Sequence, residues 1–146
     1  MEFGPRALGS RSILGDARSK EMQSTMNLKI KYRESFRPFA PLIRIEDVKD
    51  WFEVDGNNDP SNNFSSPYML MVAPIKDTHR CKVKNDDNYD LKNVNQIRSD
   101  IPAVTHVDFS ARMQTVHSQS NSRLHKLLTV FKQKTGCPII LILRLM

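Results

Sequence analysis

SNSRLHKLLTVFKQKTGCPIILILRL, residues 120 to 145, decides the fold class of this chain. Its first half has apolar residues at helical spacing, and the stripe consists of Leu124, Leu127, Leu128 and Phe131. Ser120, Asn121 or Ser122 can cap the start of this helix, and Gly136 suits its end. Residues 138–145 are apolar on both faces, which is typical of a central strand in a covered sheet. A helix followed directly by a buried strand predicts an α/β fold.

The rest of the chain alternates between the same two kinds of element. Met22, Met26 and Ile30 are spaced by four and predict a helix that starts at Ser19 and ends before Pro38. Further apolar patterns predict strands at 40–45, 68–75, 101–108 and 112–116, a turn at 109–110 and an acidic helical segment at 46–52. Residues 55–63 have loop composition, and 76–100 predict a long polar loop outside the core.

Charge and composition exclude several classes of protein. Residues 1–44 hold nine Lys and Arg against four acids, but residues 45–66 hold six acids against one lysine, so no uniform cationic surface for coating nucleic acid is expected. No apolar run approaches the roughly 20 residues that span a bilayer, and no signal-peptide pattern is present, so we expect a cytoplasmic protein without a membrane partner. Cys81 and Cys137 lack zinc-binding spacing and are expected to be reduced thiols.

KIKYRESFRPFAP, residues 29 to 41, is the first candidate binding segment. An extended backbone would direct Lys29, Lys31 and Arg33 to one side, whereas a helix would pair only Lys29 with Arg33. Arg37 follows, directly before a segment that Pro38 and Pro41 stiffen. Arginine forks match phosphate and carboxylate oxygens, so these cations suit a small phosphorylated substrate. A solvated basic helix face is the alternative interpretation.

THVDFSARMQTV, residues 105 to 116, is the second candidate segment. It places His106, Asp108 and Arg112 at a predicted strand end and turn, where a sheet fixes the position of functional side chains. The alternative is a structural histidine and an arginine paired with Asp108. No nucleophile elbow and no Walker-type phosphate loop is present. A third cationic motif, FGPRALGSRS at residues 3 to 12, contributes Arg6 and Arg11.

Five ordered motifs resemble the C-terminal domain of nodulation-type and antibiotic O-carbamoyltransferases. They are MEFGPRALGSRSILGDAR, KIKYRESFRPFAP, SPYMLMVAP, IPAVTHVDFSARMQTV and TGCPIILI, which together cover nearly the whole chain. The resemblance implies a YrdC-like open twisted mixed sheet with flanking helices. It also implies ATP and carbamoyl phosphate as substrates, from which such a domain forms carbamoyl adenylate. A larger N-terminal metal-binding domain, absent from this chain, would then transfer the carbamoyl group to a hydroxyl acceptor.

The same resemblance assigns roles to the cations. Lys31 and Arg33 resemble the KxR pair of the YrdC-like site, with Arg37 nearby, and Arg112 resembles an arginine expected at the adenylate. His106 is expected to contact the ligand. Residues 1–18, which carry Arg6 and Arg11, would form the junction with the transfer domain. No metal is expected within this chain.

Two departures from the family pattern stand out. Phe109 replaces a glycine, which is costly if the turn needs positive φ. Residues 142–146 read ILRLM where the family has NTSFN, whose serine and last asparagine form the SxN half of the nucleotide site. NTSFN read one base later from a suitable coding sequence gives ILRLM. We therefore expect a frameshift there, a fold incomplete at its C-terminus, and Met1 as an internal methionine of a longer enzyme.

These departures shape the functional expectation. Two hydrogen bonds lost from charged ligand groups would weaken binding by roughly two to four decades. A truncated last strand would also expose the apolar segment IILIL, residues 139 to 143, as a sheet edge. We expect a fragment of an O-carbamoyltransferase with little or no activity alone. The alternatives are a nonfunctional remnant of that enzyme and an independent anion-binding or nucleic-acid-binding module, which steep salt dependence would reveal.

Overall fold

The computed structural model describes residues 3–4, 6–54, 64–82 and 96–144. The elements are, in order, β1 (Ser12–Asp16), α1 (Met22–Met26), the π-helical turn η1 (Asn27–Lys31), β2 (Ala40–Arg44), η2 (Ile45–Asp47), α2 (Val48–Trp51), β3 (Val72–Pro74), η3 (Asp77–His79), η5 (Pro102–Val104), β4 (Ser110–Arg112), β5 (Gln114–Val116), α3 (Ser122–Thr135) and β6 (Ile139–Arg144). The fold is α/β with a mixed open sheet, as predicted from the sequence.

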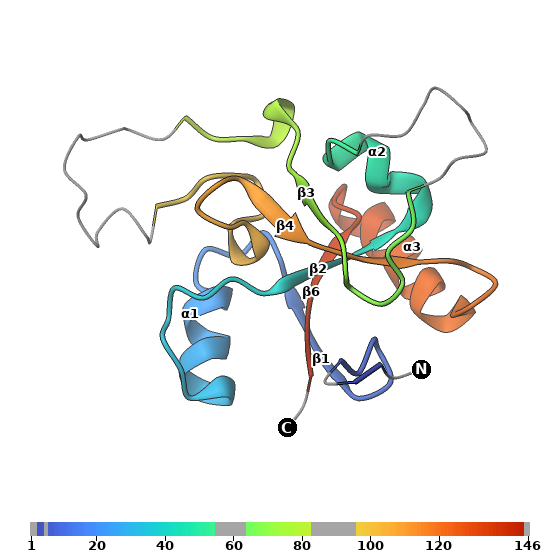
Figure 1. The fold of residues 1–146 in the computed structure, drawn as a ribbon, viewed down its shortest axis with the longest axis horizontal. Helices are drawn as coiled ribbons and strands as arrows, with labels where there is room; N and C mark the ends of the chain where they lie inside the picture. Colours follow the sequence, from blue (N-terminus) through green and yellow to red (C-terminus); the bar gives the residue numbers. More distant parts are fainter. Residues whose placement is uncertain (1–2, 5, 55–63, 83–95, 145–146) are drawn as a thin grey trace.

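The main sheet has the strand order β1-β6-β2-β5 (Figure 1). β6 pairs antiparallel with both β1 and β2, and β2 pairs parallel with β5. A second sheet consists of the antiparallel pair β3 and β4. The expectation that 139–143 would form an exposed edge is therefore wrong, because hydrogen-bonded strands flank β6 on both sides.

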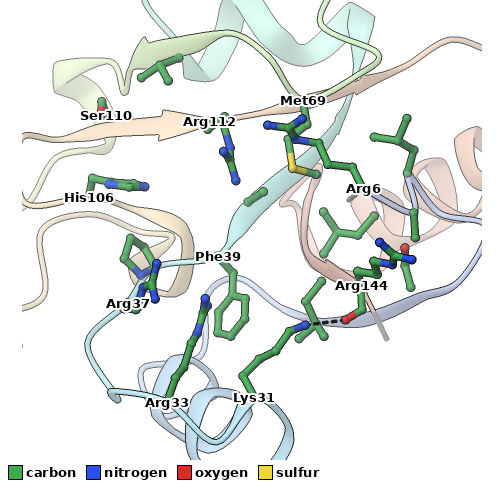
Figure 2. Close-up of a pocket in the computed structure, with 18 of the residues that line it drawn as sticks. Arg6, Lys31, Arg33, Arg37, Phe39, Met69, His106, Ser110, Arg112 and Arg144 are labelled. Atoms are coloured by element: carbon green, nitrogen blue, oxygen red, sulfur yellow. Dashed lines mark hydrogen bonds between the residues drawn. The ribbon is translucent and has the colours of Figure 1, made fainter. Parts of the chain in front are cut away.

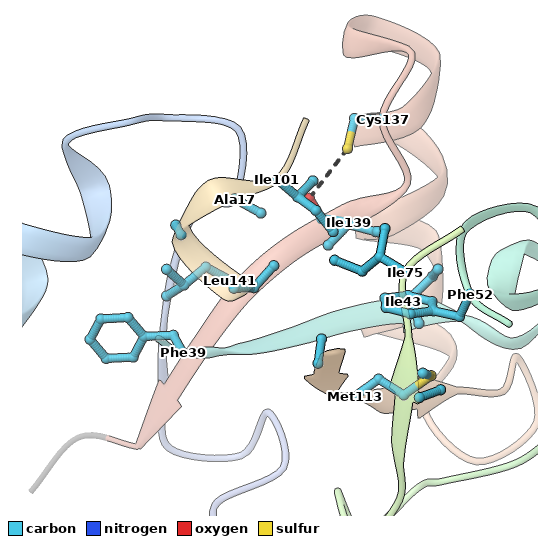
Figure 3. Packing of buried hydrophobic residues seen from close by; sticks show 14 of the residues in the cluster. Ala17, Phe39, Ile43, Phe52, Ile75, Ile101, Met113, Cys137, Ile139 and Leu141 are labelled. Carbon is cyan, nitrogen blue, oxygen red and sulfur yellow. Dashed lines mark hydrogen bonds between the residues drawn. The ribbon is translucent and has the colours of Figure 1, made fainter. Parts of the chain in front are cut away.

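The core lies on both faces of the main sheet. Ile139, Leu141 and Leu143 of β6 pack into one hydrophobic cluster, which Figure 3 shows together with Ile43 of β2 and Phe52. Ile140 and Ile142 point to the other face, where Leu124 and Leu128 of α3 cover them. Successive side chains of β6 point to opposite faces, and both faces are covered, so β6 is apolar at every position up to Leu143.

The structure confirms α3 and its caps. The Asn121 side chain accepts a hydrogen bond from the Leu124 amide, and Gly136 ends the helix with a φ of 76°. Leu127, by contrast, is 42% exposed and is not part of the buried stripe. The helix predicted from Ser19 begins three residues later, at Met22, and the strand at β2 and the helical segment at η2 and α2 are confirmed.

Two predicted strands are largely wrong. In the segment 68–75, only Val72–Pro74 is a strand, and Leu70, Met71 and Val72 are exposed. Ile101–Asp108 contains no strand, because Pro102 begins a 3-10 turn there. The strand predicted at 112–116 is present only at its end, as β5, while Arg112 is the last residue of β4, which begins at Ser110 inside the predicted turn and belongs to the other sheet.

The polar loop predicted at 76–100 is described only at its two ends. Arg80 and Ser99 form an isolated antiparallel bridge, and the Cys81 amide donates to the Arg98 carbonyl over 2.7 Å. Residues 55–63 and 83–95 of the two predicted loops lie outside the described residues. Within the described residues, no helix is long and apolar enough to cross a membrane.

Candidate functional site

A cavity of about 770 Å³ opens where the end of β6, the segment after η1 and strand β4 meet (Figure 2). This volume lies within the range of small-molecule sites. Its polar lining consists of Arg6, Ser12, Lys31, Arg33, Arg37, His106, Asp108, Ser110, Arg112 and Arg144. Six of these side chains are cationic and one is a carboxylate, so the cavity suits an anion.

Asn27 builds the first wall of the cavity. This residue is fully buried, and its Nδ2 donates to the carbonyl oxygens of Ser35 (3.0 Å) and Arg37 (2.8 Å). Its Oδ1 accepts a 2.6 Å hydrogen bond from Arg33 Nε. Because one side chain ties three points of the loop together, the loop holds Arg33 and Arg37 at the cavity. Nothing in the sequence pattern distinguished this asparagine from a surface residue.

The conformation of Tyr32 decides which cations of KIKYRE share the cavity. Tyr32 has a φ of 49° and a ψ of 48°, in the left-handed region, directly after the π-helical turn. This reversal lets Lys31 and Arg33 line the same cavity, whereas Lys29 stays exposed outside it. The extended segment considered from sequence would bring Lys29 to this side as well, and the regular helix would pair Lys29, not Lys31, with Arg33.

Lys31 and Arg33 are held at the cavity by further contacts. Lys31 Nζ donates to the Arg144 carbonyl oxygen over 2.8 Å, and the Arg33 guanidinium lies 4.8 Å from the centre of the Phe39 ring. Burial lowers the pKa of Lys31, as do the neighbouring charges of Arg33 and Arg144. Burial and the charge of Arg37 likewise lower the pKa of Arg33. Positive charge is therefore crowded on this wall, and an anion would relieve the repulsion.

The opposite wall comes from the turn before β4. Phe109 adopts a φ of 62°, and its amide donates to the His106 carbonyl over 3.1 Å, which closes a turn at 106–109, earlier in the chain than the turn predicted at 109–110. Asp108 Oδ1 accepts hydrogen bonds from the Ser110 amide (3.1 Å) and the Ser110 hydroxyl (2.7 Å). Asp108 thus stabilises the turn, and no ion pair between it and Arg112 is found in the described part of the chain.

Arg112 and His106 point into the cavity in Figure 2. Burial lowers the pKa of Arg112, and the charge of Arg6 lowers it further. Burial also lowers the pKa of His106, with Asp108 opposing and Arg112 reinforcing the effect. The lowered pKa favours the neutral form of His106, which can both donate and accept a hydrogen bond at a ligand.

The N-terminal motif contributes Arg6 but not Arg11. Arg6 forms an isolated bridge with Phe3, and Gln114 Nε2 donates to the Leu8 carbonyl over 3.1 Å, which anchors the motif on β5. Arg6 lines the cavity, whereas Arg11 is exposed and does not. Of the eight cations and histidines predicted from sequence, the structure gathers Arg6, Lys31, Arg33, Arg37, His106 and Arg112 and leaves out Arg11 and Lys29.

Arg144 is a lining residue that sequence reasoning missed as a candidate. The signal available was a single charge after the apolar run of β6. Among the described residues, no three His, Cys, Asp or Glu side chains gather in a way that could hold a metal ion.

Comparison with known proteins identifies relatives along almost the entire chain. The family model described as carbamoyltransferase C-terminus matches residues 1–142. An uncharacterised protein of Synechocystis sp. is 50% identical over 142 residues, which are 96% of this chain and 22% of that protein. Nodulation protein NolO of Bradyrhizobium diazoefficiens is 37% identical over 140 residues, 96% of this chain and 21% of the relative.

A relative with a named activity is also found. The 3'-hydroxymethylcephem-O-carbamoyltransferase of Streptomyces clavuligerus is 37% identical over 139 residues, which are 95% of this chain and 21% of that enzyme. The chain thus spans about a fifth of the length of these curated relatives.

Proposed function

This chain belongs to the family of carbamoyltransferase C-terminal domains, and we propose that its cavity binds ATP and carbamoyl phosphate to form carbamoyl adenylate. The observation that carries the proposal is that six cations and only one carboxylate line a cavity of about 770 Å³. Both substrates carry phosphate groups, and several arginine forks and a lysine match their oxygens. The name of the cephem carbamoyltransferase relative supports carbamoyl chemistry.

In the proposed reaction, the cations position and neutralise the phosphates. Water first attacks carbamoyl phosphate, the bond between its phosphorus and the carbamoyl oxygen breaks, and inorganic phosphate and carbamate result. A carbamate oxygen then attacks the α-phosphorus of ATP, the bond from that phosphorus to the β-phosphate oxygen breaks, and pyrophosphate leaves with the electron pair. Arg112 and Arg33, from opposite walls, would stabilise the charge that develops on the phosphoryl oxygens. Neutral His106 would donate a hydrogen bond to the ligand.

Transfer of the carbamoyl group to a hydroxyl acceptor is expected to need more than this chain. The resemblance implies a separate metal-binding domain for that step, and the chain spans about a fifth of its relatives. We therefore infer that the chain alone binds the two phosphorylated substrates and has little or no carbamoyl-transfer activity. A purified chain that carbamoylates a hydroxyl acceptor from ATP and carbamoyl phosphate would contradict this inference.

Isothermal titration calorimetry with ATP and with carbamoyl phosphate tests the binding proposal. Arg112→Gln removes a cation that lines the cavity and is expected to weaken ATP binding about tenfold or more, since hydrogen bonds to charged groups contribute roughly 1.5 to 3 kcal/mol. Arg123→Gln, an exposed position on α3 outside the cavity, is the matched control and should change affinity less than twofold. Equal affinities of the two variants would overturn the proposal.

The same protein can be titrated with duplex DNA at 50 and 200 mM salt. Tighter binding to DNA than to ATP, falling steeply with salt, would instead indicate a nucleic-acid-binding module. We expect ATP to bind more tightly, because the cations line a cavity of small-molecule size.

A further inference from the structure

β6 ends in a cation whose backbone is fixed from two sides. The strand pairs Arg144 with Ser12 of β1, and Ile142 with Ala40 of β2. Lys31 Nζ then donates to the Arg144 carbonyl oxygen over 2.8 Å, between residues 113 positions apart in sequence. The backbone at Arg144 is thus held by a strand and by a side chain of the cavity wall. Figure 2 shows this contact at the lower right of the cavity.

The Arg144 side chain lines the same cavity as the other five cations and is exposed, so a ligand can reach it. No carboxylate pairs with Arg144 among the residues that the structure describes. Its charge contributes to the lowered pKa of Lys31, which shows that the two charged groups interact. Lys31 keeps two of its three N–H donors for other partners, because only one is used on the carbonyl.

The cations therefore form two groups on different walls. In Figure 2, Arg6 and Arg112 lie in the upper part of the cavity and Lys31 and Arg33 in the lower part, where Lys31 Nζ contacts the Arg144 carbonyl oxygen. Neither group forms an ion pair with a carboxylate within residues 3–4, 6–54, 64–82 and 96–144, and Asp108 accepts hydrogen bonds from Ser110. Two cationic groups that share one cavity fit a ligand with several linked anionic groups better than a single monoanion.

We propose that Arg144 binds an anionic group of a polyphosphate ligand together with Lys31 and Arg33, while Arg6 and Arg112 bind another part of the same ligand. The inference deepens the proposed function and rests on it for the identity of the ligand. Arg144 then supplies a cation within residues 142–146, the segment where the sequence predicted the loss of two hydrogen bonds to the ligand. Residues 142–144 would contribute to anion binding in this chain instead of abolishing it.

Calorimetric titration with ATP, tripolyphosphate and inorganic phosphate tests the role of Arg144. Arg144→Gln is expected to weaken ATP and tripolyphosphate binding about five- to twentyfold. This loss of affinity is small for a hydrogen bond to a charged group, because water screens the charge of the exposed Arg144 side chain. Arg144→Lys should recover part of the loss, since it keeps the charge. Arg123→Gln should change neither affinity by more than twofold. Far-ultraviolet circular dichroism and thermal unfolding verify that each variant is folded.

The outcomes separate this inference from the proposed function. If Arg112→Gln weakens ATP binding and Arg144→Gln does not, the role of Arg144 is refuted and the proposed function stands. If tripolyphosphate binds in an Arg144-dependent way but ATP and carbamoyl phosphate do not bind, the proposed function fails and the inference holds. If no probe binds, or if inorganic phosphate binds as tightly as tripolyphosphate, the inference is overturned.

Discussion

The turn at Phe109 stores backbone strain that a pair of substitutions can measure. Phe109 has a φ of 62°, a region that costs a residue with a Cβ roughly 1 to 2 kcal/mol and glycine almost nothing. The turn holds both His106, through a hydrogen bond to its carbonyl, and β3, through the Ile75 amide that donates to the Phe109 carbonyl over 2.9 Å. The strain therefore lies in the wall of the cavity.

Comparing Phe109→Gly with Phe109→Ala isolates the strain. Both variants lose the ring and its contact with the Arg80 guanidinium, 5.4 Å from the ring centre, so these losses cancel between them. At ordinary φ, glycine is about 0.5 to 1 kcal/mol less stable than alanine because it has more freedom in the unfolded chain. Subtracting this cost from the strain leaves the glycine variant about 1 kcal/mol more stable, or roughly 3 °C in Tm for a chain of this size.

Thermal and urea unfolding, followed by circular dichroism, provide the measurement. Val107 is a matched control, since it is 60% exposed, lies in the same loop and is not among the described residues with positive φ. There the order should reverse, with Val107→Ala more stable than Val107→Gly. If Phe109→Ala is as stable as Phe109→Gly, the turn does not impose a left-handed conformation and the reasoning is refuted.

Two further predictions concern the scaffold. Burial raises the pKa of Asp47, but hydrogen bonds from Arg44 and Lys132 outweigh burial and lower this pKa overall. The ionised carboxylate therefore stabilises the fold above the unfolded-state pKa. This stabilisation is lost as pH falls through the lower folded-state pKa. Asp47→Asn should cost about 2 to 3 kcal/mol at pH 7 by urea unfolding and much less at pH 2, and an equal cost at both pH values would contradict this. Gly9 has a φ of 97°, and an added Cβ would lie 2.7 Å from Leu124 Cδ2, so Gly9→Ala should destabilise the chain by about 2 kcal/mol. Gly136→Ala, which has a φ of 76° but no atom within 4 Å of the added Cβ, should cost only about 1 kcal/mol, and equal losses would show that the Leu124 contact is unimportant.

Strong local signals explain which elements the sequence predicted. In α3, leucines at helical spacing are buried, Asn121 caps the first turn and Gly136 ends the helix, so each residue has the role that its type favours. The segment 68–75 has an equally apolar composition, yet Met69 turns the chain with a φ of 58° and leaves Leu70 and Met71 exposed. Hydrophobic composition alone could not reveal that this segment only partly packs against the core.

The residue types of the candidate site could be predicted from the sequence, but which of these residues line one cavity together could not. Arginines and lysines near stiff or turning backbone indicated anion binding, and most of them do line one cavity. Arg33 shares the cavity with Lys31 because of the left-handed conformation of Tyr32 between them, which residues with a Cβ rarely adopt. Arg144 reaches the cavity through the register of β6 with β1, a long-range pairing. The frameshift expected at 142–146 stays a prediction that the encoding DNA would test.

The position of β6 between β1 and β2 has a consequence for biosynthesis. β1 and β2 do not pair with each other, and each needs residues 139–144, which are translated about 100 residues after β2. On the ribosome the main sheet cannot close until these residues leave the exit tunnel, so the earlier strands must wait with unpaired edges. Lys31 meets its carbonyl partner only at that moment. The anion cavity is therefore assembled only once β6 has joined the sheet, and a phosphorylated ligand that binds it would favour the paired fold.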